Sequence, residues 1–155
     1  MADEYDSPWK EVLELHFRDF LAFFFPDIER DVDWPRGYES LDKELPKLER
    51  DAATGGRYAD KLTKVWRRNG EERLVFIHVE VQGDPDPGFP LRMYVYNYRL
   101  YDRYRRQVAS IAILADEQAG WRPQEFGYEL WGCQVGLVFP AVKLLEALPP
   151  VRMWK

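Results

Sequence analysis

The hydrophobic residues of this chain fall into patterns that predict a helix, a strand pair, a second helix and further strands. Between residues 9 and 25 the apolar positions recur at helical spacing, and Pro8 suits the first turn. We expect a helix over this range that ends at Pro26. Residues 27–57 are rich in charged and turn-forming residues, and they fit either a short strand at 38–41 or a helix through Leu45.

A β-hairpin is the clearest local prediction. Residues 58–66 and 73–81 form two runs rich in β-branched and aromatic side chains, and they flank Asn69 and Gly70. This dipeptide tolerates the positive φ angles of tight hairpin turns. We therefore expect two antiparallel strands joined at this turn.

The second half of the chain predicts an α/β arrangement. Pro90 suits the first turn of a helix that runs to about Gln107, and residues 108–115 read as a strand buried on both faces. Residues 126–131 and 133–139 predict two more strands. A strand pair followed by a helix and an apolar strand indicates a central sheet flanked by helices, and a length of 155 residues fits one domain over 1–155.

Composition narrows the class of protein. The chain is 46% hydrophobic and 32% charged, which is typical of a globular protein. The apolar stretch 20–25 is far shorter than the ~20 residues of a membrane-spanning helix, and the acidic residues 1–6 do not resemble a secretory signal, so we expect no membrane contact. One cysteine, Cys133, and two histidines, His16 and His78, argue against disulfide scaffolds and Cys/His zinc sites and favour the cytoplasm.

Carboxylates at the predicted hairpin are the candidate chemistry. Alternation along residues 74–82 places His78, Glu80 and Gln82 on one face of the strand. A turn centred on Gly70 would put Asp60 directly opposite Glu80, with Cβ atoms about 4.5–5.5 Å apart. Two unshielded carboxylates repel each other, and Mg²⁺ prefers a few such oxygens while keeping several waters. The pair therefore suggests a site for Mg²⁺ or Mn²⁺.

The same carboxylates have a plain alternative reading. Asp60 and Glu80 could form ion pairs with Lys61, Lys64 or arginines on an exposed sheet face, and spacing does not exclude this. His78 shares the face of Glu80, but a lone strand histidine is more often a semi-buried structural residue, and we leave it outside the site.

A basic strip is predicted on the helix that starts at Pro90. Four arginines fall within an arc of about 60° at 100° per residue, with a tyrosine beside them. Arginine binds phosphate bidentately and tyrosine can stack on bases, so the strip suits a nucleic-acid backbone. The alternative is a solvated face or a network with the chain's own carboxylates. The candidate nucleic-acid-binding residues are Arg92, Tyr96, Arg99, Arg103 and Arg106.

These segments carry a family resemblance. Residues 58–62 (YADKL), 77–82 (IHVEVQ) and 92–99 (RMYVYNYR) resemble the recombination-promoting nuclease and transposase-like family of the PD-(D/E)XK nuclease superfamily. The resemblance runs over about residues 9–145. It implies an α/β, restriction-endonuclease-like fold, in which a central mixed β-sheet is flanked by helices.

The resemblance also implies roles for single residues. Asp60 and Glu80 would be metal ligands, Gln82 would take the position of the superfamily's lysine in the Glu-x-Lys motif, and Glu14, rather than Glu11, would be the acid of the first helix. The implied catalytic set is Asp60, Glu80 and Gln82, and the implied activity is Mg²⁺-dependent endonucleolytic hydrolysis of DNA. Glutamine supplies no positive charge for the attacking water, which departs from the superfamily pattern.

Three functions follow from this interpretation. The first is a DNA endonuclease linked to recombination or mobile elements. The second is a catalytically silent module of the same fold that binds nucleic acid or protein, which the missing lysine and the net charge of −5 favour. The third is an RNA or nucleotide phosphodiesterase that uses the same metal pair. Association of several copies of the chain is compatible with each.

Overall fold

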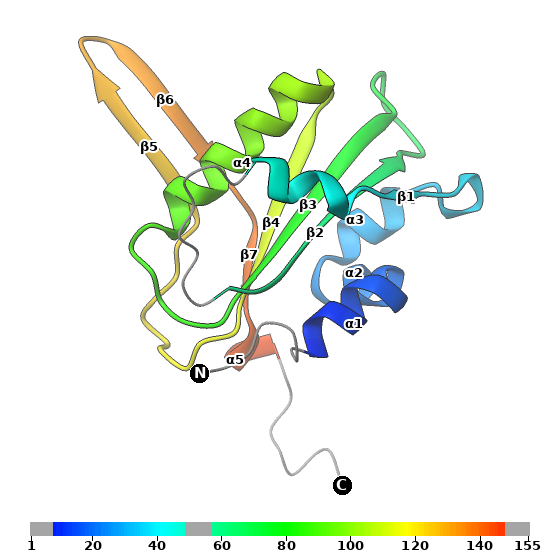
Figure 1. Ribbon diagram of the computed structural model, residues 1–155, viewed down its shortest axis with the longest axis horizontal. Helices are drawn as coiled ribbons and strands as arrows, with labels where there is room; N and C mark the ends of the chain where they lie inside the picture. Colours follow the sequence, from blue (N-terminus) through cyan, green and yellow to red (C-terminus); the bar gives the residue numbers. More distant parts are fainter. Residues whose placement is uncertain (1–7, 49–56, 148–155) are drawn as a thin grey trace, which may run out of the picture.

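The predicted hairpin forms the middle of a five-stranded mixed sheet in the computed structural model, which describes residues 8–48 and 57–147 (Figure 1). The strand order is β1-β2-β3-β4-β7. β1 and β3 lie antiparallel to β2, whereas β4 runs parallel to β3 and to β7. The strands are β1 (Glu39–Ser40), β2 (Arg57–Trp66), β3 (Leu74–Gln82), β4 (Val108–Leu114) and β7 (Ala141–Lys143).

The register of the hairpin is the one predicted from its turn. Asp60 pairs with Glu80, and Gly70 adopts a positive φ of 103° at the turn. Pairing becomes irregular between Arg57 and Ala59, where the ladder shifts by one residue. The shift lies at the end of β2 nearest Glu80, and bulges of this kind re-aim neighbouring side chains.

The first predicted helix is broken into two, and a third helix follows it directly. The predicted range 9–25 is helical, but His16 leaves the helical conformation with φ −130° and ψ 36°, and Pro26 starts a new helix instead of a loop. Proline lacks the N–H that a first helical turn leaves unsatisfied, so it fits that position. The helices are α1 (Pro8–Leu15), α2 (Phe17–Phe24) and α3 (Pro26–Asp31).

Residues 32–48 contain little regular structure. Both alternatives for this segment are found: the short strand is β1. The helix through Leu45 is a 3₁₀ helix, η3 (Asp42–Leu48), and a further 3₁₀ turn, η2 (Trp34–Arg36), precedes β1.

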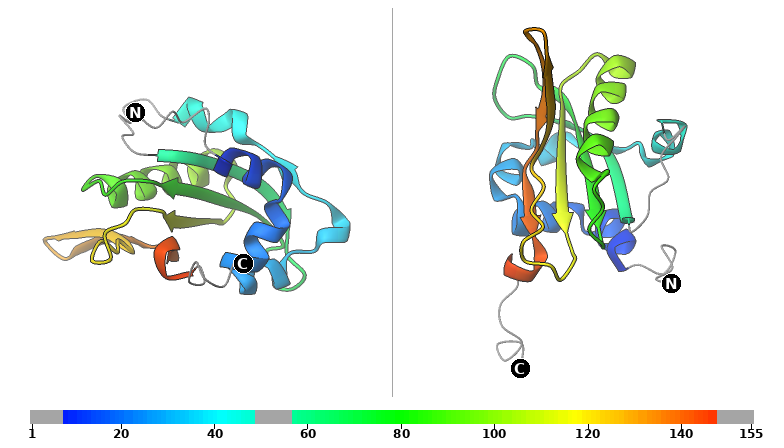
Figure 2. Two further views of the ribbon diagram at one scale, coloured as in Figure 1. Left: turned by 90° about the horizontal axis from the view of Figure 1, so that it is seen from below. Right: turned by 90° about the vertical axis from the view of Figure 1, so that its left-hand side faces the viewer.

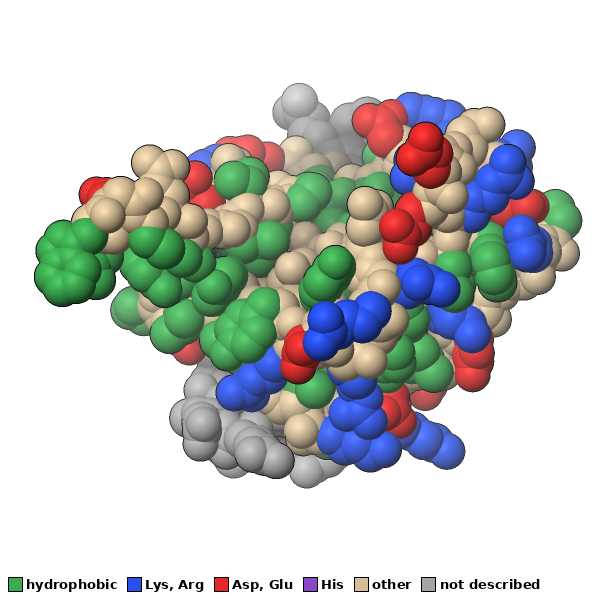
Figure 3. Space-filling view, turned by 90° about the horizontal axis from the view of Figure 1, so that it is seen from above, with side chains coloured by type: hydrophobic (Ala, Val, Ile, Leu, Met, Phe, Trp, Pro, Cys, Tyr) green, Lys and Arg blue, Asp and Glu red, His purple; other side chains and the backbone are tan. Residues whose placement is uncertain are grey.

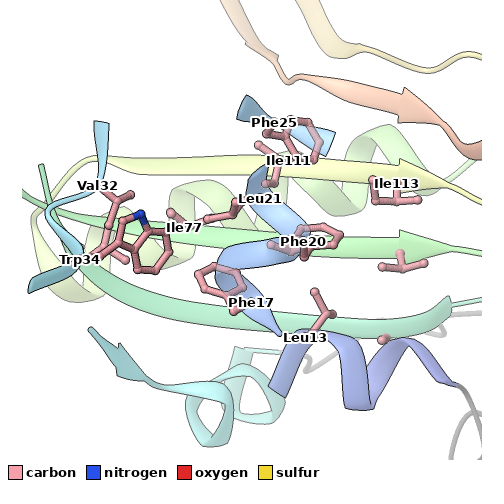
Figure 4. Close-up of a cluster of buried hydrophobic side chains, with 14 residues drawn as sticks. Leu13, Phe17, Phe20, Leu21, Phe25, Val32, Trp34, Ile77, Ile111 and Ile113 are labelled. Carbon is pink, nitrogen blue, oxygen red and sulfur yellow. The ribbon is translucent and has the colours of Figure 1, made fainter. Parts of the chain in front are cut away.

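The two faces of the sheet have different covers (Figure 2). On one face α1, α2 and α3 pack a largely aromatic cluster against the apolar side of β3, including Ile77 and Val79 (Figure 4). On the other face lies α4 (Phe89–Tyr104), the crossover helix between the parallel strands β3 and β4. The even-numbered residues of β3 point toward α4, because Tyr96 on α4 packs against His78.

Helix α4 is shorter than predicted. It stops at Tyr104 because Arg105 adopts a left-handed conformation, with φ 53°, and closes the helix with a backbone hydrogen bond to Tyr101. Arg106 therefore lies outside the helix on which it was predicted.

The two strands predicted around Gly132 form a separate hairpin. β5 (Glu125–Leu130) and β6 (Cys133–Val138) pair only with each other among the described residues and project from the body of the molecule (Figure 1). The chain then continues through β7 into the short helix α5 (Leu144–Ala147). Within the described ranges, no helix is both long and apolar enough to span a bilayer.

Candidate functional site

Asp60 and Glu80 stand side by side on the face of the sheet that α4 covers. Glu80 is fully buried in β3, the central strand, while the Asp60 side chain is one-quarter exposed. Arg57 Nη1 lies 3.0 Å from Asp60 Oδ2 and 3.9 Å from Glu80 Oε2. One guanidinium can reach both carboxylates only because they share a face, so the predicted juxtaposition is confirmed.

Gln82 lies on the same face and is held by α4. Its side-chain oxygen accepts a 2.6 Å hydrogen bond from Arg92 Nη2, and its amide nitrogen donates to the Asp84 carbonyl at 2.8 Å. Arg92 Nε lies 3.5 Å from Glu80 Oε1. A positive charge is thus present beside Gln82, although the residue itself is neutral.

Tight packing fixes the backbone just after Gln82. A Cβ atom at Gly83 would fall 2.2 Å from the ring of Tyr58 on the neighbouring strand. Only glycine allows this approach, so the ring and the strand end are held together at the edge of the site.

His78, which sequence reasoning left outside the site, belongs to it. Its Nε2 donates to Glu80 Oε2 at 3.1 Å, and its Nδ1 lies 2.9 Å from Ser110 Oγ on β4. Asn97 on α4 donates to the same Ser110 oxygen at 3.1 Å. These contacts form a continuous hydrogen-bonded line from α4 through β4 to Glu80, and they fix the orientation of its carboxylate.

The electrostatics of Glu80 follow from these neighbours. Burial by itself raises the pKa of a carboxyl group. At Glu80 this effect is outweighed by the hydrogen bond and the attraction of His78, and then by the charges of Arg57 and Arg92, so its pKa falls below the ordinary value of 4.5. The group is therefore an anion that is stabilised by the protein itself.

The donor atoms fit a hard divalent cation only in part. Asp60 and Glu80 offer carboxylate oxygens, and Glu80 Oε1 is buried without a hydrogen-bond partner. Mg²⁺ commonly uses one or two carboxylates and keeps its waters. In the described part of the chain, however, no three acidic, histidine or cysteine side chains cluster as a metal site. Glu14, the predicted helical ligand, is exposed on α1 and is not brought to the pair; Glu11 is exposed as well.

The predicted basic strip is divided among different contacts. Arg92 is buried in the site, Arg99 donates to the Leu48 carbonyl, and Arg103 lies 2.7 Å from Glu44. The contacts of Arg99 and Arg103 tie α4 to η3, as the alternative of an internal network predicts. Among the strip arginines, Arg103 and Arg106 remain exposed.

The prediction that Tyr96 binds nucleic acid is wrong. Its side chain is only 1% exposed, its ring centre lies 5.2 Å from that of His78, and its hydroxyl oxygen accepts from Arg57 at 3.4 Å. A ring in this position cannot stack on a base. Tyr96 instead packs behind the carboxylates, because the helix turns it toward the sheet.

Sequence reasoning missed Arg57, Ser110 and Asn97. His78 was detectable from the sequence, because alternation along β3 already places it on the same face as Glu80. Ser110 becomes a neighbour only through the parallel pairing of β3 with β4, which aligns it with His78, and a sequence does not reveal that register.

Comparison with known proteins finds no significant match. No family model, no curated protein and no solved structure is recognisably similar to the chain.

Proposed function

We propose that this chain is a metal-dependent DNA endonuclease of the cytoplasm, linked to recombination or mobile elements, and that its sheet is of the restriction-endonuclease type. The observation that carries the proposal is the direct pairing of Asp60 with Glu80, with Gln82 on the same face. The order of hairpin, crossover helix and parallel strand supports it, because this order sets the three residues in the middle of a rigid sheet.

Each residue of the site would have its own role in such a reaction. Asp60 and Glu80 would hold Mg²⁺ or Mn²⁺, which supplies a Lewis acid that lowers the pKa of a bound water and neutralises the scissile phosphate. His78 keeps Glu80 oriented through its hydrogen bond. Arg92 supplies the positive charge that Gln82 lacks, at a distance of 2.6 Å from the Gln82 oxygen.

A second function is favoured by a different observation. Arg57 and Arg92 already lie beside the two carboxylates and His78 donates to Glu80, and contacts of this kind satisfy a site without a metal ion. A catalytically silent module of the same fold, which binds nucleic acid or protein without cleaving it, would need no metal ion at this site.

Cleavage assays separate the two functions. In Mg²⁺ or Mn²⁺, the wild type should nick plasmid DNA, and Asp60→Asn should lower the rate by about 100-fold or more because it removes an anionic ligand. Arg92→Gln should also lose activity, whereas Arg92→Lys should keep part of it. Asp102→Asn, on the exposed side of α4, is the matched control and should be as active as the wild type.

The outcome that replaces the nuclease proposal is equally definite. If the folded wild type cleaves neither DNA nor RNA with either metal, and still binds nucleic acid when Asp60 is changed to Asn, the silent module is correct. Cleavage of RNA without cleavage of DNA would identify a ribonuclease that uses the same carboxylates.

The two exposed arginines of the strip give a prediction about DNA affinity. Arg103→Gln combined with Arg106→Gln should weaken binding and lower the slope of log affinity against log salt by about 0.9 for each phosphate that the variant no longer neutralises. Arg122→Gln, which removes an arginine paired with Glu146, should leave the slope unchanged. An unchanged slope in the double variant would assign Arg103 to its contact with Glu44 and Arg106 to the solvated surface.

A further inference from the structure

The projecting hairpin has one wholly apolar face. We call residues 125–138, which comprise β5, β6 and their connecting turn, the arm. Strand pairing aligns every second residue of β5 with every second residue of β6, so these side chains share one face. The residues of this face are Phe126, Tyr128, Leu130, Cys133, Val135 and Leu137.

The arm leaves much of this surface in contact with water. Tyr128 and Leu130 are 55% and 54% exposed, and Trp131 at the tip is 94% exposed. Hydrophobic side chains gather on this projecting end, whereas acidic and basic side chains mix over the rest of the visible face (Figure 3). A two-stranded hairpin is marginally stable by itself in water, so a covered apolar face would stabilise the arm.

The apolar surface continues from the arm onto α4. Ring contacts run from Tyr128 to Phe126 at 6.2 Å, from Phe126 to Tyr94 at 5.1 Å and from Tyr94 to Tyr98 at 5.2 Å. Tyr101 lies one helical turn beyond Tyr98 and is half exposed. The aromatic surface therefore spans two elements that meet at an angle.

The size and charge of this surface indicate what covers it. An aromatic side chain has an area of about 150–250 Å². The exposed fractions of four aromatic side chains therefore add up to about 500 Å², and these residues are Trp131, Tyr128, Tyr98 and Tyr101. A standard interface buries about 800 Å² on each partner, and the aliphatic residues add to the aromatic total. The arm contains no lysine or arginine and carries Glu125 and Glu129, so it is unsuited to a nucleic acid.

The opposite face of the arm explains why a second copy is a suitable partner. Glu125 and Glu129 lie on that face, with Gly127 and Gly136 between them. When two arms meet through their apolar faces, both acidic faces stay in water and no like charges are brought together. A two-fold axis makes each surface its own complement.

We propose that the apolar face of the arm, together with Tyr98 and Tyr101 of α4, is the interface of a symmetric homodimer. The arm of each copy lies in the angle between the arm and α4 of the other. This assembly is independent of the chemistry proposed for Asp60 and Glu80, which lie on the sheet beneath α4.

Sedimentation equilibrium of the wild type and two matched variants tests the proposal. The wild type should be a dimer at micromolar concentration. Leu130→Asp places a charge on the apolar face and should weaken the dimer by about 30-fold or more, the loss expected when an apolar interface residue is replaced by a charged one. Val138→Asp places the same charge on the opposite face of the arm, where Val138 is 76% exposed, and should leave the dimer intact.

Cys133 provides a second readout without any change to the fold. It is the only cysteine of the chain, it is exposed, and it lies on the apolar face. Its rate of alkylation should fall as the wild-type concentration rises and should be independent of concentration in Leu130→Asp.

Three results would overturn the proposal. A wild type that stays monomeric at about 200 μM, well above the micromolar range typical of weak specific dimers, has no such interface. A dimer that persists in folded Leu130→Asp, or disappears equally in Val138→Asp, is built on another surface. Open-ended association would show that the contact lacks a two-fold axis.

Discussion

Glu80→Gln should lower the free energy of unfolding by about 3–5 kcal/mol, the loss typical when one partner of a buried ion pair is removed. The substitution keeps the shape of the side chain but leaves Arg57 and Arg92 without their shared anion. A domain of this size has a total stability of about 5–15 kcal/mol, so the midpoint of urea unfolding should fall visibly. Glu125→Gln, at an exposed position, is the control and should change the midpoint little.

The pH dependence of this stability has a definite sign. Because the pKa of Glu80 is lowered in the folded protein, the unfolded chain binds a proton at this group more readily. The contribution of Glu80 is therefore complete above the unfolded value of about 4.5 and is lost as the pH falls through the lower folded value. Wild type and Glu80→Gln should differ by a constant amount above pH ~5.5 and converge below pH ~4.5. A gap that widens in acid would contradict the arrangement.

The second large effect is expected at the edge strand β7, two strands away from β3. Lys143 Nζ contacts Asp116 Oδ1 and donates to the Trp121 carbonyl at 2.9 Å, and both charged side chains are 2% exposed. Lys143→Met would leave Asp116 as an uncompensated buried charge, which costs about 3–5 kcal/mol. Asp116→Asn should cost a similar amount because it leaves the ammonium group unpaired.

A double-mutant cycle tests this pair. Asp116→Asn combined with Lys143→Met removes both charges and keeps the side-chain oxygen that accepts from the Gln118 amide. The double variant should be clearly more stable than the sum of the single losses predicts. Additive losses in urea unfolding would show that the two groups are not coupled.

The sequence was sufficient to predict the pairing at the site. Asn69 and Gly70 mark the turn, and strand alternation then aligns Asp60 with Glu80. These are local rules that act within a single hairpin. The break at His16 was not predictable in this way, because the apolar spacing continues through it while the backbone turns.

The neighbours of Glu80 depend on contacts that are distant in the sequence. Ser110 lies on β4 and Asn97 lies on α4. The buried orientation of Arg92 depends on how α4 packs on the sheet. A helical wheel places Arg92 beside Arg99 without distinguishing a residue that faces the protein from one that faces water. The sequence therefore predicts the carboxylates better than it predicts the groups that neutralise them.

The position of β3 in the middle of the sheet has a consequence for how fast the site can change. β3 is hydrogen-bonded to β2 on one side and to β4 on the other, so its backbone is fixed whatever the side chains do. Arg57 and Arg92 can leave Glu80 by rotation about side-chain bonds, without opening the ladder. Such rotations are far faster than local unfolding. The amides of His78, Glu80 and Gln82 should therefore exchange with deuterium as slowly when the arginines are displaced as when they are paired.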